Sequence, residues 1–132
     1  MVRDGRRTLA SLRAFLADFN GSEWPMRDII RGASPWGCWS TWIDGWLYRC
    51  NTLWLRHEEL VNDLPACVES IALHLQIEPT GREIPSFDEL HAAAPTYWRS
   101  GATEGNGGMS PEDERLFWDL HGGTMALLGY ER

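Results

Sequence analysis

Apolar residues recur at helical spacing near the start of the chain. After Gly5 they return every three or four positions, at Leu9, Leu12, Phe15, Leu16 and Phe19. This period predicts an amphipathic helix over residues 6–19, which Asn20-Gly21 ends. The apolar residues in "MRDIIRGA" predict a short second helix before the Ser34-Pro35 turn.

A second periodic segment is rich in tryptophan. Trp39, Trp42, Trp46 and Cys50 lie three or four residues apart, so on a helix they share one face. We expect that face to be packed in the core, where tryptophans at helical period are usually found. The alternative left open is that the stretch 36–54 forms the wall of a ligand pocket.

The middle of the chain has the character of a strand followed by a helix. Residues 52–57, "TLWLRH", are rich in β-compatible types and end at acidic residues, which predicts a short buried strand. Asp63 before Leu64-Pro65 is a cap that begins a helix to about residue 75. Val2 resembles the exit of another strand into the first helix. Strand-then-helix order favours a parallel α/β layer.

Two further helices are predicted by their caps. Ser86 precedes "FDELHAAA", and Ser110-Pro111 begins a final helix that runs towards Leu128 and stops at Gly129. At 132 residues, with 43% hydrophobic content and eight tryptophans, the chain predicts one folded domain with a modest core.

Composition narrows the classes of partner. The net charge is −7 and all twelve basic residues are arginine, so we expect no nucleic-acid partner, and any anion is held by guanidinium groups. Cys38, Cys50 and Cys67 lack metal-site spacing, which predicts free thiols and no metal. We expect no membrane span and a cytoplasmic location, because the chain has neither a long apolar run nor a signal-peptide pattern.

Two segments are candidates for anion binding. Arg3 stands at the expected strand exit, and Ser11 lies two turns into the following helix, so both could meet a phosphate there. Arg99, Ser100 and Gly101 lie in a polar, glycine-bearing loop that could approach a ligand closely. The alternatives are a solvated surface arginine in the first case and an exposed connector in the second.

In this order the segments resemble the PAPS-dependent sulfotransferases, over nearly the whole chain but only the carboxy-terminal half of the family. "VRDGRRTLAS" is similar to the segment whose arginine and serine hold the 3′-phosphate, which gives that role to Arg3 and Ser11. "TLWLRHEELVNDLPACVESIALHL" is similar to the family's strand, acidic loop and helix. "YWRSG" is similar to the segment that closes over the 3′-phosphate, here Arg99 and the backbone of Ser100 and Gly101.

The resemblance implies residues 1–132 as a partial sulfotransferase domain, the carboxy-terminal portion of a P-loop-type parallel-sheet fold. It would be mostly helical, with one or two short parallel strands. The implied co-substrate is PAPS, with product 3′,5′-ADP, and a sulfuryl group would pass to a hydroxyl or amine of a small-molecule acceptor. The family's amino-terminal P-loop-like turn with its lysine, and its histidine base, have no counterpart, so the catalytic residues are unknown. We expect the isolated chain to be inactive.

The other titratable residues have simpler expected roles. We expect His57 to be packed or capping, His74 to be structural, and His91 and His121 to be solvated or weakly paired. Asp44, Glu58 and Glu59 are expected as caps or solvated charges.

A different class of protein stays open, namely a non-catalytic helical interaction or nucleotide-binding module derived from such a half. Its truncated sheet would expose edges and an apolar face, which self-association or a complementing amino-terminal chain would cover. A fragment of an ordinary enzyme, or a misplaced start, is the third possibility.

Overall fold

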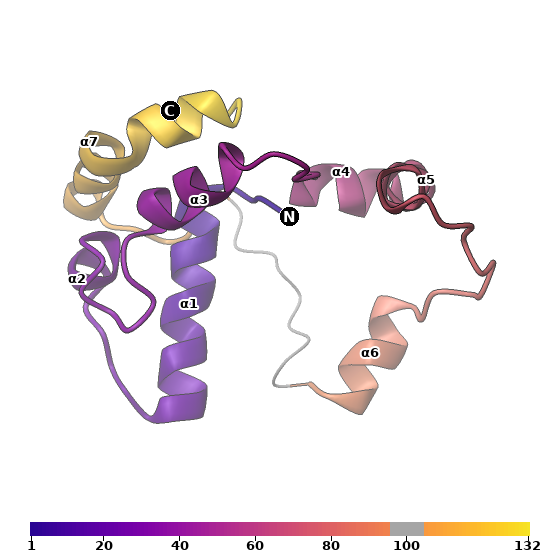
Figure 1. Cartoon of the computed structure of the whole chain (residues 1–132). Helices are drawn as coiled ribbons and strands as arrows, with labels where there is room; N and C mark the ends of the chain where they lie inside the picture. The colour runs from indigo at the N-terminus through magenta and orange to yellow at the C-terminus, as the bar shows by residue number, and fades with distance from the viewer. Residues whose placement is uncertain (96–104) are drawn as a thin grey trace.

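Helices make up most of the computed structural model, which describes residues 1–95 and 105–132 (Figure 1). In chain order they are α1 Gly5–Asn20, α2 Met26–Ile30, α3 Trp39–Leu47, α4 His57–Asn62, α5 Leu64–Leu75, α6 Phe87–Ala93 and α7 Pro111–Leu127. The described residues contain no strand, so the predicted α/β parallel-sheet fold is wrong, and the chain is a mostly helical small domain.

One parallel bridge stands where the sheet was expected. Val2 N–H donates to Leu55 O at 2.8 Å, and His57 N–H donates to Val2 O at 2.7 Å. The predicted strand 52–57 is therefore extended backbone with a single bridge at Arg56. The pairing goes no further because each of the two segments enters a helix soon after the bridge. The helix at His57 was not predicted; Glu59 Oε2 begins it by accepting from Arg56 N–H at 3.0 Å.

The core lies between α1, α2, α3 and α7. Its largest fully buried side chains are Leu9 and Leu16 of α1, Ile29 and Ile30 of α2, and Phe117, His121 and Met125 of α7. Leu9 and Leu16 are the buried part of the predicted apolar stripe of α1, whereas Phe19 at its end is 50% exposed. Four helices thus form a body around one core.

Most helix ends lie where the caps predicted them. The side chains of Asp63, Ser86 and Ser110 accept backbone N–H groups in the first turns of α5, α6 and α7. Gly21 ends α1, and Gly129 follows the end of α7. These signals are local, so they predict helix ends whatever the rest of the chain packs against.

We predicted that the helix face shared by Trp39, Trp42, Trp46 and Cys50 packs in the core, and that prediction is wrong. Trp39 is 6% exposed, whereas Trp42 is 60% and Trp46 is 47% exposed, and Cys50 is exposed beyond the helix end. Ile43, one turn after Trp39, is the second buried residue of α3. The side of α3 that packs against α7 is therefore the side of Trp39 and Ile43, and two of the three tryptophans lie outside it.

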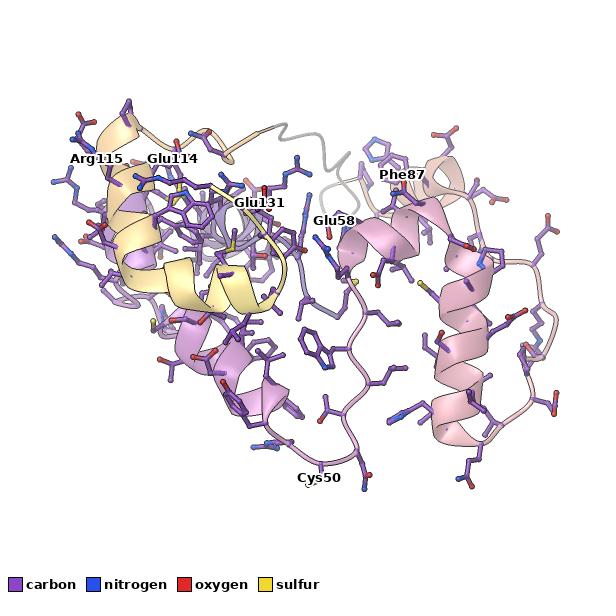
Figure 2. The ribbon with its side chains drawn as sticks, turned by 90° about the horizontal axis from the view of Figure 1, so that it is seen from above. Cys50, Glu58, Phe87, Glu114, Arg115 and Glu131 are labelled. Atoms are coloured by element: carbon purple, nitrogen blue, oxygen red, sulfur yellow. The ribbon has the colours of Figure 1, made fainter. Side chains whose placement is uncertain are left out.

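The helices α4, α5 and α6 form an arm that extends from the body (Figure 1). α4 packs on α5, and in α5 only Cys67 and Ala72 are buried. Tyr130, after α7, joins the arm to the body: its hydroxyl donates to Glu58 Oε2 at 2.7 Å, and its ring lies under the Arg56 guanidinium, 4.5 Å from the ring centroid. Glu58 is at the start of the arm, where it meets the body (Figure 2).

Candidate anion-binding site

The parallel bridge brings two chain exits to one edge. Beyond Val2 the chain continues through Arg3 into α1, and beyond Arg56 it enters α4 at His57. Chains that run in parallel leave their pairing at the same edge, which is where ligands bind in open parallel layers. Within residues 1–95 and 105–132 there is no sheet, and this single bridge is what brings the two exits together.

Beyond the bridge, Arg3 and Arg7 lie near enough to His57 for their charges to act on its imidazole. Burial lowers the pKa of His57, and the nearby charges of Arg3 and Arg7 lower it further, while Glu58 opposes them. The imidazole is therefore neutral at pH 7, and the two guanidiniums supply the positive charge. We define these three residues as the basic cluster.

Asp4, the acidic residue beside Arg3, is hydrogen-bonded and ion-paired to Arg6. Asp4 Oδ1 accepts from Arg6 N–H at 2.8 Å and caps α1. Its Oδ2 pairs with Arg6 Nη2 at 2.7 Å, and Arg6 Nη1 also reaches Glu114 at 3.3 Å. The hydrogen bond with Asp4 is the main reason that the pKa of Arg6 is raised. Asp4 and Arg6 thus neutralise each other beside the basic cluster.

Ser11 is exposed on α1, farther along than Arg3. At about 1.5 Å of rise per residue, its backbone lies roughly 9 Å along the axis from the start of the helix at Gly5. Arg7 is one turn before Ser11 and shares its face. Sequence reasoning paired Ser11 with Arg3 and missed Arg7, although the i, i+4 spacing of Arg7 and Ser11 was available as a signal.

The second candidate segment, Arg99 with Ser100 and Gly101, lies outside the described residues. The chain is described again from Gly105, whose carbonyl accepts from Arg7 Nε at 3.4 Å. Gly107, at φ 72°, packs so closely on α1 that a Cβ there would lie 2.7 Å from Arg6 O. The end of this loop therefore contacts the first turns of α1, next to Arg7.

His121 is buried rather than solvated, which corrects the sequence-based expectation. Its Nε2–H donates to Ile30 O at 2.9 Å. Because the carbonyl can only accept, Nδ1 is the unprotonated nitrogen and accepts from Ser40 Oγ at 3.0 Å. Burial lowers its pKa and outweighs the opposing hydrogen bond to Ile30. The neutral ring joins α7 to α2 and α3.

Three acidic residues that were expected as caps or solvated charges, Asp44, Glu58 and Glu59, make structural contacts. Asp44 accepts from Thr124 Oγ1 at 3.1 Å, and Glu59 caps α4 as described. Burial and the hydrogen bond to Glu58 raise the pKa of Tyr130 to about 12. Asp44 thus joins α3 to α7, Glu58 joins α4 to the residues after α7, and Glu59 stabilises the start of its own helix.

The remaining histidines lie at the surface of the arm. His74 is exposed on α5, where a structural role was expected. His91 is exposed on α6, and its ring lies 5.7 Å from that of Phe87, centroid to centroid. Neither residue joins the basic cluster.

Cys38, immediately before α3, has a thiol whose pKa is affected by burial and by hydrogen bonds. Burial raises its pKa, but hydrogen bonds from Ser40 and Thr41 outweigh burial, so the pKa is lowered from the ordinary value. The single hydroxyl proton of Ser40 is donated to His121 Nδ1, so Thr41 is the position to change. We expect Thr41→Val to raise the pH midpoint of iodoacetamide alkylation at Cys38, measured by peptide mass spectrometry.

Alkylation of Cys50 in the same samples is the control for this prediction. Cys50 lies at the outer bend of the loop between α3 and α4 (Figure 2) and has no part in the contacts of Cys38. An unchanged midpoint at Cys38 in Thr41→Val would show that the hydrogen bond from the Thr41 hydroxyl does not stabilise the thiolate.

No family model, curated protein or solved structure matches this chain. Within residues 1–95 and 105–132, no helix has the length and apolar character needed to cross a membrane. The same described ranges contain no group of three histidine, cysteine or acidic side chains placed to hold a metal ion.

Proposed function

We propose that this chain binds the 3′-phosphate of an adenosine nucleotide, PAPS or its product 3′,5′-ADP, at the basic cluster. The observation that carries the proposal is that Arg3 and Arg7 lie near enough to His57, just beyond the Val2–Arg56 bridge, for their charges to act on its imidazole. The proposal therefore rests on the placement of these side chains.

The chemistry of the basic cluster suits a phosphate monoester. Guanidinium groups donate two parallel hydrogen bonds to phosphate oxygens and stay charged at every physiological pH. Arg3 and Arg7 therefore offer an anion charged, forked donors in a chain whose net charge is −7. The exposed Ser11 hydroxyl, one turn beyond Arg7, is a further donor for a phosphate that lies along α1.

In this proposal the chain is the nucleotide-anchoring part of a sulfotransferase-type protein. The reaction would be in-line transfer of a sulfuryl group from PAPS to a hydroxyl or amine of a small acceptor, a reaction that depends on positioning and electrostatics. Arg99, Ser100 and Gly101 would close over the same phosphate. No described residue is assigned as catalytic, and we expect no PAPS-dependent turnover from the isolated chain.

Thermal unfolding with 3′,5′-ADP tests the binding step. A ligand that binds only the folded state stabilises it by about 2.7 kcal/mol at 100 times its dissociation constant, so the melting temperature should rise. We expect Arg3→Ala and Arg7→Ala each to reduce this rise, because each removes a forked donor. Arg13→Ala is the matched control, since Arg13 is an exposed arginine farther along the same helix.

The same titration followed by NMR gives an independent readout at His57. A bound phosphate would offset the charges of Arg3 and Arg7 that lower the pKa of this imidazole, so its pKa should rise on binding. A melting temperature that does not respond to 3′,5′-ADP in folded protein would contradict the proposal. A response that survives in both Arg3→Ala and Arg7→Ala would place the ligand elsewhere.

A further inference from the structure

Four tryptophans are exposed on and around α3. Trp36 is 61%, Trp42 60%, Trp46 47% and Trp54 42% exposed. Large aromatic side chains on a monomer surface are costly when they stand together, because their apolar area remains in contact with water. We define these four residues as the tryptophan face.

The tryptophan face is continuous. Trp42 borders three hollows: one of about 240 Å³ shared with Trp36, one of about 440 Å³ with Trp36 and Trp46, and one of about 280 Å³ with Trp46 and Trp54. The rings of Trp42 and Trp46 lie 6.4 Å apart, centroid to centroid. The face is therefore one ridged apolar surface and not a set of scattered side chains.

The charged side chains around the tryptophan face are relevant to whether a second copy of the chain can bind there. Of the described residues that line the three hollows, Arg49 bears the only charged side chain, and its guanidinium lies over the Trp46 ring at 4.5 Å. The chain as a whole has a net charge of −7, so two copies repel each other at acidic surfaces. No carboxylate lines the three hollows, so this face adds none of the acidic charge that keeps two copies apart elsewhere, and it gives a basic partner nothing to pair with.

The four tryptophans supply more than half of the apolar area that a stable dimer needs on each partner, and adjoining apolar residues extend it. Taking about 250 Å² for a fully exposed tryptophan side chain, the four residues present roughly 500 Å². A standard stable interface buries about 800 Å² on each partner, and the adjoining apolar residues Met1, Leu12, Leu47 and Leu53 line the same hollows. A twofold axis places identical patches against each other, so the face supplies its own complement.

We infer that two copies of this chain associate in solution through the tryptophan face, with Trp42 at the centre of the contact. The inference is independent of nucleotide binding, because no residue of the basic cluster belongs to the face. Buried tryptophans near the centre of an interface are the residues whose removal weakens association most. The rest of the contact would exclude water around them.

Sedimentation velocity across about 1 μM to 100 μM, a range of 100-fold around typical weak-dimer affinities, tests this inference. The wild type should shift from monomer to dimer with concentration. Trp42→Gln and Trp46→Gln should each raise the dissociation constant at least about tenfold, which corresponds to 1.4 kcal/mol. Both side chains are largely exposed, so melting temperatures close to that of the wild type should show that the variants fold.

Leu73→Gln is the control, because Leu73 is an 82% exposed apolar residue on the arm. It should leave the dissociation constant unchanged. A wild type that stays monomeric throughout the concentration range overturns the inference. So does a dimer that persists in Trp42→Gln and Trp46→Gln, or one that only Leu73→Gln disrupts, which would assign self-association to α5.

Discussion

Phe117→Ala is expected to lower the free energy of unfolding by about 3–5 kcal/mol, the usual cost of removing a buried phenylalanine. Phe117 is fully buried on α7, and its ring centroid lies 6.0 Å from that of Trp39 and 5.0 Å from that of His121. The substitution leaves a cavity where α1, α3 and α7 meet, and these helices can close it only partly. Urea denaturation followed by circular dichroism measures the change.

Leu120→Ala is the matched control for this prediction. Leu120 lies three residues farther along the same helix and is 51% exposed, so its removal should change the free energy of unfolding by no more than about 0.5 kcal/mol. Equal losses in the two variants would contradict the core described above. In that case α7 would not present Phe117 to the other helices.

His121→Ala is expected to lower the free energy of unfolding by about 2–4 kcal/mol, through lost packing and unsatisfied buried groups. The ring is fully buried and is packed edge-on against Trp39, with centroids 5.8 Å apart. Without it, Ile30 O and Ser40 Oγ lose the hydrogen bonds they make to its two nitrogens. The same urea titration at pH 8 measures this loss.

The pH dependence of stability distinguishes His121 from an ordinary packed residue. Burial lowers its folded-state pKa from the ordinary value near 6.5, so the unfolded chain binds the proton more readily. The stability that comes from the neutral ring is complete above about pH 6.5 and is lost as the pH falls through the lowered pKa. The difference between wild type and His121→Ala should therefore shrink on acidification; a constant difference would contradict a buried neutral imidazole.

Helix positions could be predicted from the sequence where the signals that set them are local. The stripe from Leu9 to Phe19 and the caps Asp63, Ser86 and Ser110 act over one or two turns, so they predict helix positions whatever the chain packs against. The segment 52–57 shows the limit of this reasoning. Its β-compatible composition is satisfied by extended backbone with one bridge, because whether a strand joins a sheet depends on partners distant in sequence.

It was harder to predict which side chains are buried than to predict where the helices lie in the sequence. Trp39, Trp42 and Trp46 have the same spacing, yet only the first is buried, because α7 covers the side of Trp39 and Ile43. His121 lies among acidic and glycine residues in the sequence, and no local pattern shows that Ser40 and Ile30 O meet its ring. Both outcomes are decided by contacts between segments roughly 80 residues apart.

The candidate site was predictable in part. Arg3 was singled out from its place before the first helix, and the structure places it at the edge beyond the bridge. Arg7 and His57 joined it only when the fold brought the starts of α1 and α4 together. Arg99, Ser100 and Gly101 remain sequence-based predictions, since they lie outside the described residues.

The most direct test of the central claim is a calorimetric titration of the folded chain with 3′,5′-ADP and, separately, with 5′-AMP. The two nucleotides differ only in the 3′-phosphate that the basic cluster is proposed to hold. We expect 3′,5′-ADP to bind at least about tenfold more tightly, a difference of 1.4 kcal/mol. Equal affinities, or no heat of binding with 3′,5′-ADP, would contradict a 3′-phosphate site at Arg3, Arg7 and His57.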